Sequence, residues 1–250
     1  MTAPVTLIGS PVSPYVRKVL AACAIKGVEV AVDPITPFMG DEAFSRISPL
    51  RRIPVWIEGD LTLCDSSVII EYLEETRPGP SLWPVDPADR ARARWLEEYG
   101  DTRVFDVLGW KLFFQIALKP RFFGGETDPE IVARARDVEL PEVLAYLESV
   151  TPESGFLFGE TPCVADFAVT AAFMNLEIIR VAVDAERWPR FAGLIARVQE
   201  TPLGPLNRLA KQLMKTPVEH HRDVLPDFGL RPTERTHLCA TVMRGPLTPA

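Results

Sequence analysis

Apolar positions in the first third of the chain follow the period of a strand, then that of a helix, then that of a strand again. Residues 5–8 form a short apolar run, which predicts a strand. Residues 14–26 carry apolar side chains at helical spacing, and Gly27 follows the last of them, where a helix is expected to stop. Residues 28–32 predict a second strand. Two strands joined through one helix predict a βαβ unit with parallel strands.

The next apolar runs predict a hairpin and a further helix. Residues 54–57 and 61–64 are two short strand-like runs, and the gap between them contains Gly59. Helical spacing begins again after Asp65, a residue type that favours the N-cap of a helix. The first part of the chain therefore predicts the order β-α-β, crossover, β-β-α.

After a proline-rich stretch at residues 77–87, the pattern is helical. Residues 164–181 are apolar on nearly all sides, which is typical of the buried helix of a bundle. Pro141 lies inside another predicted helix, where it predicts a kink or a break. Helices are predicted over residues 88–118, 128–150, 164–181, 191–198 and 203–214.

These patterns divide the chain into two domains and a tail. Residues 1–79 predict a small α/β domain, and residues 86–215 predict an all-helical domain. Residues 216–250 are rich in Pro, Arg and Thr without a period, so we expect a loosely packed or disordered tail. A chain of 250 residues is long enough for two modest domains.

Composition and charge exclude several functions. The net charge of −7, without a dense basic stripe, argues against a nucleic-acid partner. No apolar run has the length of a membrane span, and the residues before the first strand lack the basic region and apolar core of a secretory signal, so we expect neither feature. The four cysteines are scattered, which fits neither a disulfide framework nor a zinc site, so we expect a reducing, cytoplasmic location. No metal site is expected: the histidines, at positions 220, 221 and 237, all lie in the tail, and an adjacent pair cannot share one face of a helix.

Ser13 is the candidate with the most chemical meaning. Serine is a residue type that favours the N-cap of a helix, and the proline that directly follows it, Pro14, favours the first helical position. The free N–H groups and the dipole of a helix N-terminus favour negative charge. A hydroxyl at this place is therefore suited to hold a thiolate, and the simpler alternative is that it only caps the helix.

Three short motifs resemble those of the glutathione transferase family, and the resemblance covers about residues 4–215. Residues 13–19 are similar to the Ser-Pro-Phe segment of serine-type cytosolic members, residues 48–54 to the family's Asn-Pro-x-Gly-Lys-Val-Pro, and Asp65-Ser66 to its Glu/Gln-Ser. The resemblance implies a thioredoxin-like N-terminal domain and an all-helical C-terminal domain. It also implies glutathione as co-substrate, a small-molecule electrophile as partner, and a homodimer.

The same resemblance implies roles for individual residues. Ser13 would stabilise the glutathione thiolate, and Pro54 would follow a cis peptide bond, so that the Ile53 backbone pairs with the cysteinyl unit of glutathione. Arg52 would lie near the glycine carboxylate, while Arg51 stands where the motif has glycine. The γ-glutamyl end of glutathione would be bound by Asp65 and Ser66.

Several alternatives remain open at this point. Tyr15 is a rival hydroxyl and Ser10 a second donor near Ser13, both ranked below it. The second substrate would face aromatic and basic side chains, for which core packing in the helical bundle is the simpler explanation. They are Tyr15, Trp110, Phe113, Phe114 and Arg121, with Lys111, Phe122 and Phe123 nearby in the sequence.

The helix predicted from residue 164 has an unusual candidate cap. Cys163 and Asp166 resemble the family's Ser/Thr-x-x-Asp capping box, but a thiol replaces the hydroxyl. Thr161 is the alternative cap, and the sequence does not decide between the two.

The resemblance leads to a functional hypothesis with two classes of outcome. The first is a glutathione transferase, with a glutathione-dependent disulfide reductase or dehalogenase as a variant of the same enzyme. The second is a transferase-like module that binds a protein or a ligand without turnover. A redox protein of the thioredoxin type is disfavoured because the chain has no C-x-x-C pair.

Overall fold

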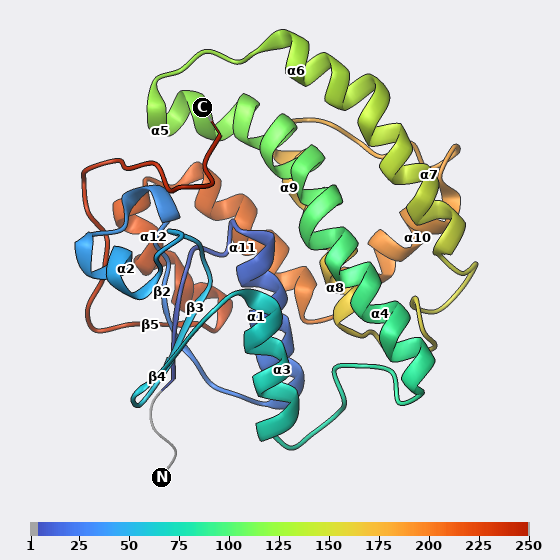
Figure 1. The fold of residues 1–250 in the computed structure, drawn as a ribbon, viewed down its shortest axis with the longest axis horizontal. Coiled ribbons are helices and arrows are strands. Elements are labelled where there is room, and N and C mark those ends of the chain that lie inside the picture. The colour runs from blue at the N-terminus through green and yellow to red at the C-terminus, as the bar shows by residue number, and fades with distance from the viewer. Residues whose placement is uncertain (1–4, 250) are drawn as a thin grey trace. The chain divides into compact units, whose positions relative to one another are not determined.

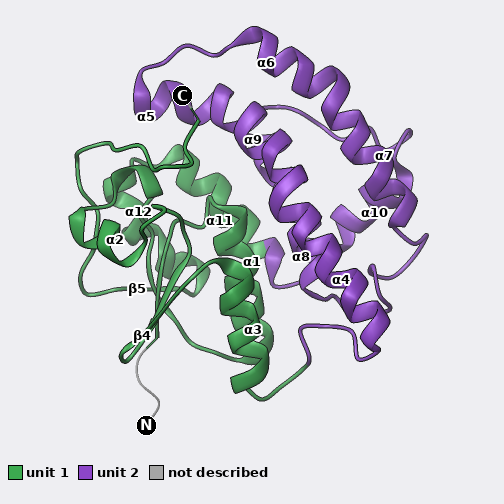
Figure 2. Ribbon diagram, viewed as in Figure 1, with its two compact units in different colours: residues 1–80, 205–250 green, residues 81–204 purple. Residues whose placement is uncertain are grey.

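The computed structural model describes residues 5–249, and the contacts of the chain divide it into two compact units. Unit 1 comprises the chain up to Pro80 together with the segment from Pro205 onward, and unit 2 is Ser81–Gly204 (Figure 2). Within the described residues, no helix is long and apolar enough to cross a membrane.

Unit 1 is built on a five-stranded mixed sheet with the order β4-β3-β1-β2-β5 (Figure 1). β1 and β2 are parallel, as expected for strands joined through a helix, and β3 and β4 form an antiparallel hairpin. The strands are β1 Val5–Ile8, β2 Ala31–Asp33, β3 Val55–Glu58, β4 Leu61–Cys64 and β5 Arg231–Pro232.

The helices of the first eighty residues flank this sheet, and α1 packs against α3 (Figure 1). Ser13 caps α1, Pro14 is its first residue, and Gly27 ends it with a φ of 64°, as the sequence signals predict. The core includes Leu7, Val55 and Trp56, which are fully buried. The helices are α1 Pro14–Lys26, the 3₁₀ turn η1 Pro37–Met39, α2 Glu42–Ile47 and α3 Ser66–Thr76.

Unit 2 is helical, with π-helical stretches inside its long helices. The predicted helix over residues 88–118 is found as α4, η2 and η3, of which η2 and η3 are π-helical. The elements are α4 Pro87–Tyr99, η2 Gly100–Val104, η3 Asp106–Leu118, α5 Lys119–Phe123, α6 Pro129–Arg134, η4 Ala135–Glu139, α7 Leu140–Val150, α8 Val164–Ala171, α9 Phe173–Ile178 and α10 Pro189–Val198.

Pro141 does not end its helix. The π-helical segment Ala135–Glu139 directly precedes it, and α7 continues through it. Proline has no N–H to donate to the carbonyl four residues earlier, and a wider π turn accommodates that missing bond.

The central helix α8 is buried along its whole length, as its apolar sequence predicts. Cys163 is its N-cap residue, which decides against Thr161. The buried Asp166 carboxylate accepts hydrogen bonds from the N–H of Cys163 (2.8 Å) and of Leu157 (2.9 Å). Burial raises the pKa of Asp166, and these two donors act against that rise.

The C-terminal segment differs from the expectation of a loose tail and of a helical domain that reaches residue 215. From Pro205 onward the chain belongs to unit 1, and β5 adds a parallel strand beside β2. Long-range backbone pairing and buried polar contacts order this segment, and neither leaves a periodic sequence signal. Its helices are α11 Leu203–Lys215, η5 Val218–His220, α12 His221–Val224 and η6 Leu225–Phe228.

Candidate functional site at one edge of the sheet

Strand register brings the three sequence motifs to the same edge of the sheet. Ile8 at the end of β1 pairs with Val55 at the start of β3, and Val55 pairs with Cys64 at the end of β4. The segment that leaves β1, the segment that enters β3 and the segment that leaves β4 therefore meet there. These segments carry Ser13, Arg52, Ile53, Pro54, Asp65 and Ser66.

Gly9 shows how closely two of these segments approach. Its φ is +147°, and a Cβ placed on it would lie 2.7 Å from Val16 Cγ2 and 2.9 Å from Ile53 Cβ. Glycine is therefore required between the first turn of α1 and the Ile53 segment. This contact places Ile53 beside the helix that Ser13 begins.

The Ser13 hydroxyl is only loosely engaged by its own helix. Its Oγ accepts from the Val16 N–H at 3.5 Å, the outer limit of a hydrogen bond. The side chain is half-buried at the N-terminus of α1. Tyr15, the rival hydroxyl, is also half-buried, whereas Ser10 is buried and accepts from the Val12 N–H at 3.3 Å.

Arg17 holds the loop that precedes Ser13, a role that the sequence analysis missed. Its fully buried guanidinium donates to the carbonyl oxygens of Pro11 (2.8 Å) and Val12 (2.9 Å). Burial lowers the pKa of Arg17 to about 9, so the group is still largely protonated at neutral pH. The only sequence signal was a charged residue inside the apolar run of α1.

The Ile53–Pro54 peptide bond is cis, as the resemblance implied. Ser48 fixes the backbone of Arg52, the residue before Ile53. The Ser48 Oγ accepts from the Arg52 N–H (2.9 Å) and donates to the Arg52 carbonyl (2.8 Å). Ile53 is buried and the Arg52 side chain is exposed.

Arg51 takes the conformation that explains a glycine in the family motif. Its φ is 48°, in the left-handed region. Its guanidinium donates to the carbonyls of Pro37 (3.0 Å) and Gly40 (2.9 Å) and to the Ser45 hydroxyl, and it lies over the Phe44 ring. These contacts compensate for an unfavourable backbone conformation of about 1–2 kcal/mol.

Asp65 and Ser66 begin α3 at the same edge. Asp65 is exposed, has a φ of 80°, and accepts from the Ser67 N–H at 2.9 Å as the helix cap. Ser66 is buried as the first residue of α3. The Asp65 carboxylate has a second oxygen beyond the one that caps the helix.

The candidates for a second-substrate wall in unit 2 are mostly packed inside that unit. Phe113 and Phe114 are buried, and the half-buried Trp110 contacts Phe114 edge to face at 5.5 Å between ring centroids. Arg121 is exposed, with its guanidinium 5.7 Å from the centre of the Phe122 ring.

Lys111 is engaged by carboxylates of its own unit. Its ammonium lies 2.7 Å from both Asp106 and Glu139, and Arg103 also binds Glu139 at 3.0 Å. The Lys111 hydrogen bond, against the opposing effect of burial, lowers the pKa of Glu139. Lys111 therefore joins η3 to η4, and its charge is already neutralised by these carboxylates.

All four cysteines are free thiols. Burial raises the pKa of Cys23 to about 12, so this thiol is inert at neutral pH. Cys64 is exposed at the end of β4, and its thiol contacts the Ile47 carbonyl at 3.1 Å. Between residues 5 and 249, no group of three or more His, Cys, Asp or Glu side chains is placed to hold a metal ion.

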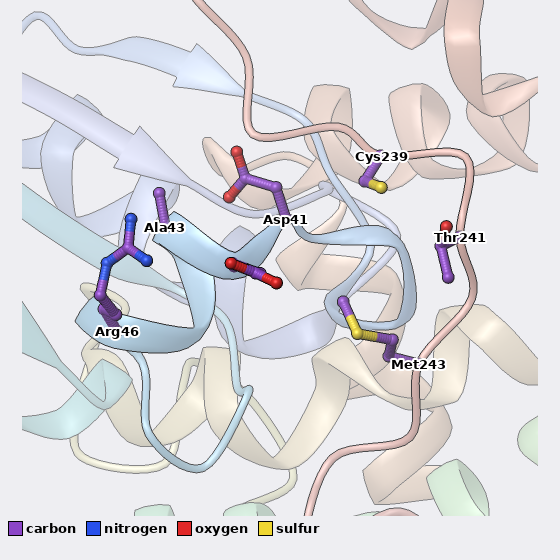
Figure 3. Close-up of a pocket in the computed structure, with 7 residues that line it drawn as sticks. Asp41, Ala43, Arg46, Cys239, Thr241 and Met243 are labelled. Atoms are coloured by element: carbon purple, nitrogen blue, oxygen red, sulfur yellow. The ribbon is translucent and has the colours of Figure 1, made fainter.

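A separate pocket of about 450 Å³ lies between the α2 region and the C-terminal segment (Figure 3). The side chains around it carry carboxylate, guanidinium, thiol and thioether groups. They are Asp41, Glu42, Ala43, Arg46, Cys239, Thr241 and Met243.

Comparison with known proteins identifies the family. Sequence models of the glutathione S-transferase N-terminal and C-terminal domains match residues 7–81 and 121–203. A probable glutathione S-transferase of Solanum tuberosum is 30% identical over 202 residues, which are 76% of this chain and 83% of that protein. The chain belongs to the glutathione S-transferase family.

One further relative and one solved structure are also similar to this chain. The FtsZ-localized protein A of Caulobacter vibrioides is 28% identical over 170 residues, which are 66% of this chain and 74% of that protein. A solved glutathione S-transferase of Methylobacterium radiotolerans, in complex with glutathione sulfonate, is 26% identical with a TM-score of 0.67. That likeness covers 80% of this chain and 92% of the other.

Proposed function

We propose that this transferase-family protein binds glutathione and that the Ser13 hydroxyl stabilises its sulfur as a thiolate. The observation that carries the proposal is the position of this hydroxyl. It lies at the N-terminus of α1, held by its own helix only through a 3.5 Å contact, on the sheet edge that also carries Ile53 and Asp65. A thiolate at this place would replace a weak internal hydrogen bond by a charge-assisted one.

The other residues of this edge would bind the rest of the tripeptide. The Ile53 backbone would pair with the cysteinyl unit, and the exposed Arg52 would attract the glycine carboxylate. Asp65 would receive the γ-glutamyl ammonium with its second oxygen, and Ser66 would receive the γ-glutamyl carboxylate. The complex of the Methylobacterium radiotolerans relative with glutathione sulfonate supports this choice of ligand.

The energetics of thiolate formation are within reach of these groups. A free thiol has a pKa of about 8.5, and lowering it by about two units requires roughly 2.7 kcal/mol. A hydrogen bond to a charged group contributes about 1.5–3 kcal/mol. A helix N-terminus adds about 0.3–1 kcal/mol. Ser13 therefore needs only to donate a hydrogen bond to the sulfur, and its hydroxyl keeps its proton.

In the proposed reaction, the thiolate attacks an electrophilic carbon. The sulfur electron pair forms the new S–C bond, and the leaving group departs with the electron pair of the bond that breaks. With a chlorinated nitroarene, the products are the thioether and a chloride ion. With a disulfide as substrate, the thiolate would attack a sulfur atom instead of a carbon: a new S–S bond forms, the original S–S bond breaks, and the other half of the disulfide leaves as a thiolate.

Two measurements together test this function. The protein is passed over immobilised glutathione and eluted with free glutathione, and turnover of a chlorinated nitroarene is followed in parallel. We expect retention together with turnover. The proposal would be refuted if the protein is not retained and also does not bind free glutathione at millimolar concentration.

A module that binds without turnover is the second candidate function. The similarity to the FtsZ-localized protein A favours it, because the name of that relative describes where the protein localises rather than a reaction. Retention on glutathione without turnover of nitroarenes, disulfides or halogenated substrates would favour this alternative.

Three further features belong to the same proposal. A small electrophile would be the second substrate, with the half-buried Tyr15, near Ser13 in unit 1, as a candidate contact. A homodimer is expected from the family, and light scattering at micromolar concentration tests it. A reducing, cytoplasmic location is expected because all four cysteines are free thiols.

A further inference from the structure

The C-terminal tail, here residues 231–245, forms hydrogen bonds with two segments that adjoin the proposed glutathione site. It lies beyond residue 203, where the match to the family's C-terminal domain ends. In Figure 1 it follows β5 along the edge of the sheet beside β2 and passes the α2 region. The Thr233 N–H also donates to the Val32 carbonyl at 3.1 Å, extending the β5 pairing.

The first of these contacts is with Asp33, the last residue of β2. The buried Asp33 carboxylate accepts from the Thr236 hydroxyl at 2.6 Å and from the His237 N–H at 2.7 Å. The Asp33 carbonyl in turn accepts from the Gly9 N–H at 2.8 Å. The tail is thus one residue away from the loop that leads to Ser13.

The second contact is with the loop between β2 and α2. The His237 carbonyl accepts from the Asp41 N–H at 2.9 Å, and the Cys239 N–H donates to the Met39 carbonyl at 2.8 Å. The His237 ring also contacts the Asp41 carboxylate at 3.0 Å. On its other side, the same loop supplies the Gly40 carbonyl that Arg51 binds.

Gly245 completes the contact with Arg51. A Cβ on Gly245 would lie 3.1 Å from the Cβ of Arg51 and 3.1 Å from the carbonyl oxygen of Leu50. Arg51 directly precedes Arg52 and Ile53, so the tail presses against the main chain that enters the second glutathione-contacting segment.

We propose that the tail is a positioning element for the glutathione site. Through Asp33 it fixes the loop before Ser13, and through the loop at residues 38–41 and Arg51 it fixes the main chain at Arg52 and Ile53. The inference rests on the proposed glutathione binding. It predicts that tail contacts far from the ligand control glutathione affinity while leaving affinity for the electrophile unchanged.

The test uses single substitutions in the full-length chain. Thr236→Val removes the hydroxyl that binds Asp33, and Thr236→Ser keeps it. Gly245→Val pushes on Arg51 from the outer side. Asp223→Asn is the control, since it removes the charge from an exposed contact with His220 (3.2 Å) that lies upstream of the tail and includes neither Asp33 nor the loop at residues 38–41. Calorimetry measures glutathione affinity at a temperature where circular dichroism shows each variant to be folded.

We expect Thr236→Val and Gly245→Val to weaken glutathione binding about fivefold or more. The KM for glutathione should rise while the KM for the electrophile stays constant, and Thr236→Ser and Asp223→Asn should bind as the wild type does. Wild-type affinity in both folded variants would overturn the positioning role alone. Failure of the wild type itself to bind glutathione would instead overturn the proposed function, and the positioning role with it.

Discussion

Replacement of Ser13 by alanine separates the two roles that its hydroxyl can have. As a helix cap, the hydroxyl accepts from the Val16 N–H at 3.5 Å, so its loss should cost only about 0.5 kcal/mol of unfolding free energy, the low end for caps. As a donor to a thiolate, the hydroxyl contributes about 1.5–3 kcal/mol. That contribution corresponds to a loss of roughly 10- to 150-fold in kcat/KM.

The assay compares stability and rate in the same variants. Urea unfolding gives the free energy, and conjugation of a chlorinated nitroarene gives kcat/KM for glutathione. Asp86→Ala is the matched control, because Asp86 caps α4 through the N–H groups of Ala88 and Asp89, both at 2.9 Å. It should lose about 1 kcal/mol of stability with no change in rate. If Ser13→Ala behaves like this control, the hydroxyl is only a cap and the reasoning is refuted.

Three further predictions test other parts of the structure. Gly9→Ala puts a methyl group 2.7 Å from a neighbouring side-chain atom and should cost about 2–4 kcal/mol in urea unfolding; unchanged stability would contradict this packing. Glu139→Gln should cost about 1 kcal/mol at pH 7. Because the pKa of Glu139 is lowered on folding, thermal melts should show this difference above its ordinary value of 4.5 and lose it as the pH falls through the lower folded-state value; a difference that grows with acidity would be inconsistent. Iodoacetamide at neutral pH should label the exposed Cys64 before the buried Cys23, and peptide mass spectrometry showing the reverse order would exclude the burial described here.

The sequence could predict those elements whose signals are local. Helix α1 begins and ends where Ser13, Pro14 and Gly27 predict, because a cap, a first-turn proline and a left-handed stop each act within a few residues. The βαβ unit and the hairpin follow from apolar periods of the same short range. The helical character of unit 2 was predictable for the same reason.

The tail could not be predicted, since its contacts are distant in sequence. Thr236 reaches Asp33 across 203 residues, and strand β5 has two residues, one of them a proline. Neither feature produces a period or a propensity signal. The π-helical stretch before Pro141 was not predicted either. The missing N–H of a proline signals that the regular hydrogen-bond pattern is interrupted, but not that the interruption takes the form of a wider turn.

The site was predictable as residue types and motifs, but its assembly was not. Ser13, Ile53 and Asp65 lie far apart along the chain, and only the register of Ile8, Val55 and Cys64 brings their segments to one edge. The groups that hold these segments have no motif of their own. The Arg17 and Arg51 guanidinium groups bind main-chain carbonyls, and such partners are known only once the loops are folded.

The pKa of the sulfur of bound glutathione is the most direct measure of the central claim. Ultraviolet absorbance of the thiolate, titrated in the wild-type complex and in the Ser13→Ala complex, gives this value for each protein. The account predicts a wild-type pKa about two units below the ~8.5 of a free thiol, with most of that difference lost in the variant. A bound sulfur that titrates like the free thiol in the wild-type complex would contradict it.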